Sequence, residues 1–146
     1  MNFIERFRRL LPGIWFGLLA AIAFIATPAA FGALDVAQAG LVVRKIFEWE
    51  AGLSLAFGLL TLVIERRVGL ARHRESGASQ FTTEMMLALG ALFCTVGGYY
   101  GVQPAMEAAR AGGSSGLTFG QLHALSMAFF SAKGLLVLAL AWKATR

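Results

Sequence analysis

The stretch that decides the fold is LTFGQLHALSMAFFSAKGLLVLALAWK, residues 117–143. A helix crosses the hydrocarbon core of a bilayer when it has about 20 consecutive, mostly apolar residues, so this stretch predicts a membrane-spanning helix. Thr118 and Gln121 have the spacing of a capping box, which marks the start of that helix. Two ionisable residues interrupt the apolar pattern, His123 near the start and Lys133 in the middle.

Three similar apolar stretches precede this one. The chain is 58% hydrophobic and 14% charged, with a mean hydropathy of +0.68, whereas a soluble domain carries roughly 25% charged residues. We therefore predict an all-α fold: one integral membrane four-helix bundle over residues 1–146. The expected helices cover about residues 11–34, 46–64, 83–102 and 118–142, with a turn at 35–45 and a polar linker at 66–80.

The basic residues gather at one end of the predicted bundle. Nine lie at the two termini and in the polar linker, and three lie at the opposite end. Cytoplasmic segments of membrane proteins carry an excess of Lys and Arg, so we expect both termini in the cytoplasm and a location in the cell membrane, in the first place the bacterial inner membrane. The nine are Arg6, Arg8, Arg9, Arg66, Arg67, Arg72, Arg74, Lys143 and Arg146, and the three are Arg44, Lys45 and Arg110.

The composition also argues against several classes of function. The net charge of +5 lies in short segments that flank apolar helices, so the expected partner is the lipid bilayer and not a nucleic acid. The single cysteine, Cys94, provides neither a disulfide framework nor a cysteine metal cluster. The sequence has no HExxH motif, phosphate-binding loop or nucleophile with a matching base, so we expect no enzyme. These features leave assembly into a homo-oligomer open.

Small residues and prolines are expected to shape the helix contacts. Association in lipid depends on close packing at small residues and on polar contacts. Proline removes a backbone donor and clashes with the carbonyl four residues earlier, so Pro28 predicts a kink at Phe24. The residues expected to shape packing are Gly17, Pro28, Gly58, Gly97, Gly101 and Pro104.

Polar side chains from three helices are expected to meet in a layer near the outer membrane boundary. A helix rises ~1.5 Å per residue. By this measure, the distance from the cytoplasmic end of the helix is ~26–30 Å for Glu48, Gln103 and His123, close to the ~30 Å thickness of the hydrocarbon core. Glu50 and Glu107 lie at similar heights. These five residues form the predicted outer polar layer.

This outer polar layer permits three functional interpretations. Imidazole with carboxylates suits zinc, iron or copper(II), so the leading hypothesis is a non-enzymatic protein that binds or permeates a small cation or metal ion around His123. A haem-binding redox protein with His123 as an axial ligand is the second. In the third, the protein is a ligand-free accessory or structural subunit, and His123 bonds Glu48 or Gln103 only to hold the helices together.

Lys133 lies deeper than this layer, ~15 Å from the basic end of its helix. Ser126 and Lys133 continue the helix face of His123, and intramembrane ionisable residues almost always face the bundle interior or water. We therefore expect a polar track that points inward. Lys133 then either pairs with a carboxylate such as Glu84, or loses its proton. If it faced outward, it would extend toward the cytoplasmic headgroups and the carboxylates Glu84 or Glu65.

Three segments carry a resemblance to a known family. GLVVRKIF opens the second helix, YYGVQPAMEAAR closes the third and FGQLHALS opens the fourth. In this order they resemble the small four-helix membrane proteins typified by transmembrane protein 205, over nearly the whole chain. The resemblance implies a four-span protein, with a domain of unknown function in bacterial members; the animal member's association with platinum-drug resistance points to handling of metal compounds. Its most specific residues are Phe119, His123 and Ser126, supported by Phe47 and Pro104.

Overall fold

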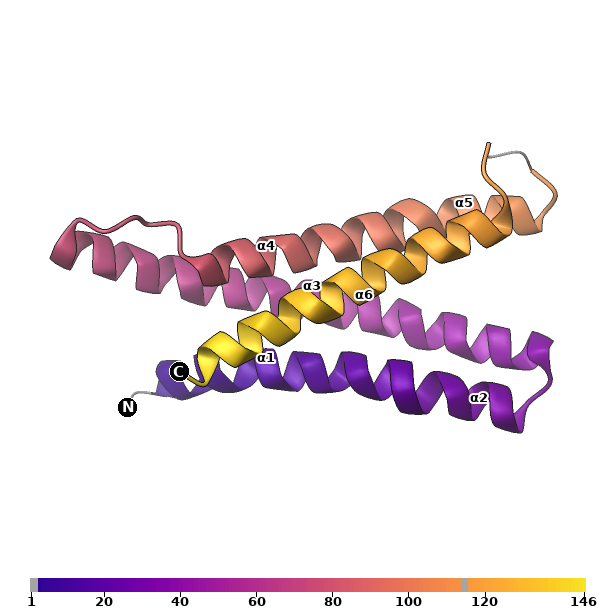
Figure 1. Cartoon of the computed structure of the whole chain (residues 1–146), viewed down its shortest axis with the longest axis horizontal. Coiled ribbons are helices and arrows are strands. Elements are labelled where there is room, and N and C mark those ends of the chain that lie inside the picture. The colour runs from indigo at the N-terminus through magenta and orange to yellow at the C-terminus, as the bar shows by residue number, and fades with distance from the viewer. Residues whose placement is uncertain (1–2, 114–115) are drawn as a thin grey trace.

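The computed structural model describes residues 3–113 and 116–146, and every element in that part of the chain is helical. The elements form four rods, each long and apolar enough to cross a membrane (Figure 1). The predicted all-α class is thereby confirmed. The first rod consists of α1 (Phe3–Ala21), the π-helix η1 (Ile22–Ala26) and α2 (Thr27–Ala33); the second is α3 (Val36–Ser76); the third consists of α4 (Thr83–Thr95), the π-helix η2 (Val96–Gly101) and α5 (Val102–Arg110); the fourth is α6 (Phe119–Ala144).

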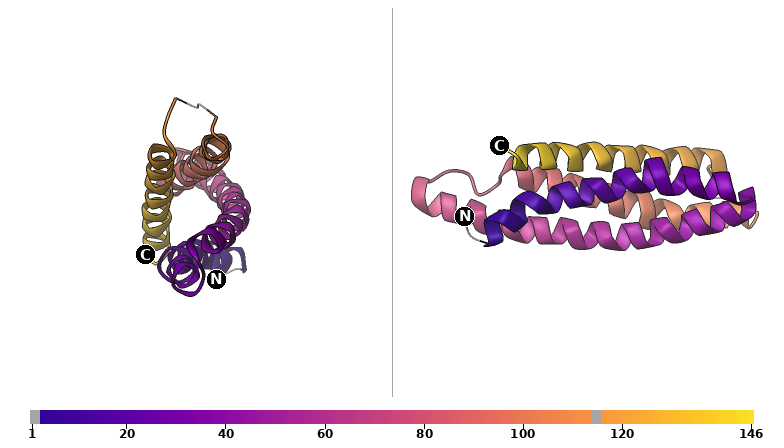
Figure 2. Two further views of the ribbon diagram at one scale, coloured as in Figure 1. Left: turned by 90° about the vertical axis from the view of Figure 1, so that its right-hand side faces the viewer. Right: turned by 90° about the horizontal axis from the view of Figure 1, so that it is seen from below.

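The rods run alternately up and down around a common axis (Figure 2). Both ends of the chain and the α3–α4 loop lie at one end of the bundle, here named the basic end. The α2–α3 and α5–α6 connections lie at the opposite end. A buried apolar cluster of Trp15, Leu19, Ala91 and Val137 joins three rods. Many other large apolar side chains face outward, as lipid-facing helices require.

Helix α3 is much longer than the sequence predicted. The turn expected at 35–45 and most of the linker expected at 66–80 are helical. The Asp35 side chain accepts a hydrogen bond from the backbone N–H of Gln38 at 2.9 Å, which starts α3 almost directly after α2. Gly77 ends it with a left-handed φ of 68°. Hydropathy detects only the apolar part of a helix. It does not detect the polar helical residues that continue α3 on both sides of that part.

Helix α6 begins where the sequence placed it. The Thr118 hydroxyl accepts from the Gln121 backbone N–H at 3.2 Å, and the Gln121 side chain accepts from the Thr118 N–H at 2.9 Å. The predicted capping box is confirmed, because a local hydrogen-bond pattern of this kind needs no tertiary partner.

Only some of the glycines expected at helix contacts lie at one. A Cβ on Gly58 would stand 2.5 Å from the Leu92 side chain, and one on Gly97 would stand 3.2 Å from the Phe129 ring. A Cβ on Gly17 would meet nothing within 4 Å, and the nearest atom at Gly101 belongs to its own rod. The expectation is therefore corrected for Gly17 and Gly101, because a spacing of small residues does not reveal whether another helix lies opposite.

Each of the two π-helical segments lies just before a proline. η1 ends at Ala26, two residues before Pro28, and η2 ends at Gly101, three residues before Pro104. A wider turn accommodates the missing backbone donor and the ring that would clash with the preceding turn. At Phe24, where Pro28 predicted a kink, the structure has the π-helical segment η1.

Candidate functional site

A chain of buried hydrogen bonds crosses the interior of the bundle. In α6, Lys133 Nζ donates to Glu50 Oε1 of α3 at 2.6 Å. The same carboxylate oxygen accepts from the Ser54 hydroxyl, and that hydroxyl accepts from Trp15 Nε1 of α1 at 2.9 Å. The side chains of Lys133 and Glu50 are only 3% and 2% exposed. We name these four residues, Trp15, Glu50, Ser54 and Lys133, the central cluster.

Local sequence explains how the central cluster forms. Glu50 and Ser54 are four residues apart, so they share one face of α3. Ala51 on the same helix is fully buried and lets the neighbouring helices approach closely. In α6, the Lys133 ammonium lies 5.2 Å from the centroid of the Phe130 ring, and this ring meets Phe47 of α3 edge to face. The Phe130 ring therefore lies next to the ammonium group, and the Phe47 ring holds the Phe130 ring from the side of α3.

The contacts of Glu50 determine what the central cluster can do chemically. A buried carboxylate must be matched by positive charge and hydrogen-bond donors, and Lys133 and Ser54 supply both. A carboxylate is also a ligand for a proton or for a small hard cation. The cluster therefore places one basic and one acidic group in direct contact inside the bundle.

Glu50 also lines a groove on the side of the bundle. The groove has a volume of about 470 Å³ and lies between the first rod and α3. Its lining is apolar except for Glu50 and for Lys45. The apolar lining residues are Leu18, Ile22, Val42, Ile46, Trp49 and Leu53.

The structure does not assemble the predicted outer polar layer. Glu50 belongs to the central cluster, whereas Glu48 is exposed and bound by Lys45 of the same helix at 2.8 Å. Glu107 is exposed and lies 3.8 Å from Arg44. Counting residues placed Glu50 at the height of His123, whereas its contact with Lys133 places it deeper in the bundle. Counting also gave no information about the direction in which each carboxylate points.

His123 is the clearest correction. It is exposed and stacks on the Phe119 ring, with the centroids 6.2 Å apart. Within the described part of the chain it makes no hydrogen bond to Glu48 or Gln103, and Gln103 is half-buried without joining it. The predicted contact is wrong because Leu122, and not His123, points into the core.

The predicted metal centre does not form either. Among residues 3–113 and 116–146, no group of three or more His, Cys, Asp or Glu side chains is placed to hold a metal ion. His123 and the carboxylates expected to join it lie apart for the reasons given above. A role of His123 as a haem ligand stays a prediction.

Lys133 points inward, but its partner differs from those the sequence suggested. Glu65 is bound by Arg8 through two hydrogen bonds of 2.6 and 3.0 Å, and Glu84 lies 3.8 Å from Lys143. Both carboxylates belong to the basic end. Ser126, the other residue of the expected polar track, is half-buried, and its hydroxyl donates to the Gly98 carbonyl at 3.4 Å.

The sequence reasoning assigned no functional role to Trp15 or Ser54. The sequence contained one signal for the central cluster. Glu50 and Ser54 are four residues apart and so share one face of their helix, and another helix of the same bundle carries Lys133. The indole of Trp15 could not be assigned, because an apolar helix with several aromatic residues does not show which ring points inward.

Comparisons with known proteins place the chain in a family. A family model described as a domain of unknown function, DUF4149, matches residues 10–115. This range contains Trp15, Glu50 and Ser54 of the central cluster, and Lys133 lies beyond it. No curated protein and no solved structure matches the chain. Since the matched residues are most of the chain, the protein belongs to the DUF4149 family, whose domain has no known function.

Proposed function

We propose that this protein is a multi-pass protein of the cell membrane that binds a small cation at Glu50, and that Lys133 occupies the same carboxylate when the cation is absent. The observation that carries this proposal is the 2.6 Å contact between Lys133 and Glu50, both buried, within apolar helices. We also propose kinship with the proteins typified by transmembrane protein 205, which fits the four-span setting but assigns no ligand.

Energetics favour a functional role for the ion pair over a purely structural one. A lysine at the bilayer centre costs about 2.5–3.5 kcal/mol on insertion scales, and such residues mark ion paths and proton relays. A buried ion pair generally gives no more stability than apolar residues of the same volume. Apolar residues would therefore hold the helices together as well as Glu50 and Lys133 do. The alternative, a ligand-free structural subunit, is separated from the proposal by the transport experiment below.

Charge balance suggests how cation binding would proceed. The ion pair is neutral overall, and uncompensated charge in a low-dielectric interior is costly. A cation that binds Glu50 keeps the site neutral only if Lys133 gives up one proton. The proposed event is thus the exchange of one monovalent cation for one proton, with Ser54 donating to the carboxylate in both states.

We expect the orientation to follow the distribution of basic residues, with both termini inside the cell. In a variant without the native thiol (Cys94→Ala), Ser76→Cys at the basic end should be protected from a membrane-impermeant maleimide applied to intact cells. Ala111→Cys at the opposite end should react. Ser76 and Ala111 are both exposed, so their accessibility depends on the side of the membrane alone. Reaction of both cysteines, or of Ser76→Cys only, would contradict this orientation.

The cation proposal predicts cation-dependent proton movement. Vesicles that contain the purified protein and a pH-sensitive dye should lose an imposed pH gradient when NaCl or KCl is added. Glu50→Gln keeps the volume and removes the charge, so it should abolish the response. Glu48→Gln is the matched control, because Glu48 lies on the same helix but is exposed and paired with Lys45. An equal response in wild-type and Glu50→Gln vesicles, or none in wild type, would favour the structural subunit.

A further inference from the structure

A second cavity lies at the basic end and is independent of the central cluster. Its volume is about 360 Å³, and residues of α1, α3, α4 and α6 line it, together with Arg146. Five of the lining side chains are basic and three are acidic. The basic ones are Arg8, Arg9, Arg72, Lys143 and Arg146.

Three of these basic side chains are matched by carboxylates, and two are not. Arg72 and Arg146 form no ion pair with any residue that the structure describes. The lining side chains therefore carry a surplus of two positive charges, on the two guanidinium groups that form no ion pair with a described residue. The matched pairs are Arg8 with Glu65 at 2.6 Å, Arg9 with Glu5 at 3.2 Å, and Lys143 with Glu84 at 3.8 Å.

The fold holds Arg72 in position over this end of the bundle. The loop after α3 folds back on the helix: His73 Nδ1 hydrogen-bonds the Ala78 carbonyl at 2.7 Å. Gly69 lies so close to the loop that a Cβ there would stand 2.4 Å from the Gln80 carbonyl oxygen. The final turns of α3 are therefore braced by the loop and do not project as a free arm.

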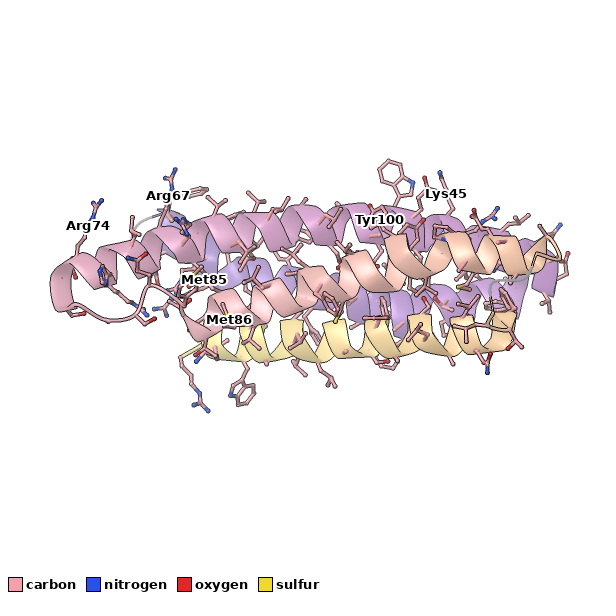
Figure 3. All side chains as sticks on the ribbon, turned by 90° about the horizontal axis from the view of Figure 1, so that it is seen from above. Lys45, Arg67, Arg74, Met85, Met86 and Tyr100 are labelled. Carbon is pink, nitrogen blue, oxygen red and sulfur yellow. The ribbon has the colours of Figure 1, made fainter. Side chains whose placement is uncertain are left out.

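Other arginines of the same helix point elsewhere. Figure 3 shows Arg67 and Arg74 directed away from α4 and α6, and neither lines the cavity. The separation of Arg72 from Arg74, two residues apart on α3, follows from the helical turn of about 200° between them. If positive charge were spread evenly over this end of the bundle, Arg72 and Arg74 would contribute equally to anion binding. A site in the cavity instead depends on Arg72, which lines it, and not on Arg74.

The lining also has an apolar part. Pro12 and Leu140 line the cavity and are buried, and each lies about one helical turn further from the basic end than Arg8 and Lys143, respectively. Guanidinium groups bind phosphate through paired hydrogen bonds. We propose that this cavity binds the phosphate group of an anionic phospholipid, with the glycerol portion directed toward Pro12 and Leu140. A soluble phosphate shares the same chemistry, and the apolar wall at the membrane boundary favours the lipid.

The test measures lipid binding to the full chain in a neutral maltoside detergent, where no charged membrane surface contributes. Phosphatidylglycerol should raise the melting temperature in a saturable way, and phosphatidylcholine should not. Arg72→Gln should weaken the phosphatidylglycerol affinity about tenfold or more, the loss expected for one charge-assisted hydrogen bond. Arg74→Gln, the matched control, should bind as the wild type does. Arg146→Gln should act in the same direction as Arg72→Gln.

Two outcomes would overturn the proposal. Equal weakening by Arg72→Gln and Arg74→Gln would show a diffuse charge effect, and equal stabilisation by the two lipids would show that phosphate charge is not recognised.

Inorganic phosphate and glycerol 3-phosphate form a further arm. If they raise the melting temperature with the same dependence on Arg72 while the lipid does not, the site is upheld and its ligand is a soluble phosphate. Arg72 and Arg74 are exposed, so neither variant threatens folding.

Discussion

Replacing Lys133 by Met should lower the free energy of unfolding by about 3–5 kcal/mol, the loss typical when one partner of a buried ion pair is removed. Met has a similar length and no charge, so the change leaves the Glu50 carboxylate buried without its cation. Ser54 would then be the one hydrogen-bond donor left to this carboxylate among the residues that the structure describes. The measurement is reversible unfolding of the purified protein in mixed micelles, with helix content as the signal.

A second substitution tests whether Lys133 stabilises the protein by pairing with Glu50 or is buried without contributing to stability. In the Lys133→Met, Glu50→Gln double variant no buried charge remains, and stability should recover to near the wild-type value or above it. Lys143→Met is the control: its ammonium lies 3.8 Å from Glu84 at a partly exposed position, so the loss should stay below about 1 kcal/mol. If Lys133→Met were as mild as this control, or raised stability, the ion pair would not hold the interior together.

The sequence was sufficient for the general architecture because one property, hydropathy, determines it. Four apolar stretches of spanning length predicted four rods, and the capping box at Thr118 located the start of α6. The same property failed for α3, where the Asp35 side chain caps the first turn and Gly77, with a left-handed φ, ends the helix. Helix length beyond the membrane depends on such caps and not on apolar content.

The site was harder to predict because it depends on rotation about each helix axis. Residue counting placed Glu48, Glu50 and His123 near one height, yet only Glu50 turns inward. A single residue along a helix changes the direction by about 100°, so Leu122 and His123 face different surroundings. The partner of Lys133 lies 83 residues earlier in the chain, and no local pattern in α6 encodes that distance.

The contact between α6 and the third rod should be almost as sensitive as the ion pair. A Cβ on Gly98 would stand 2.5 Å from the Cβ of Phe129. Neither atom can move without its backbone, so Gly98→Ala should force α6 away from η2 and cost about 1–3 kcal/mol or more. Phe129 precedes Lys133 by one helical turn, so the shift should also lengthen the 2.6 Å contact with Glu50. Unfolding in mixed micelles measures the loss.

The geometry at Gly98 predicts that shortening the Phe129 side chain does not restore stability. Phe129→Ala keeps the Cβ that causes the clash, so the Gly98→Ala, Phe129→Ala variant should remain destabilised. Gly17→Ala is the control on another helix: nothing lies within 4 Å of its added Cβ, and the change from glycine should stabilise by about 0.5–1 kcal/mol. Rescue by Phe129→Ala would show that the ring, a flexible neighbour, limits the approach. A loss greater than that of Phe129→Ala alone would show that the backbones of α6 and η2 set the closest approach at this contact.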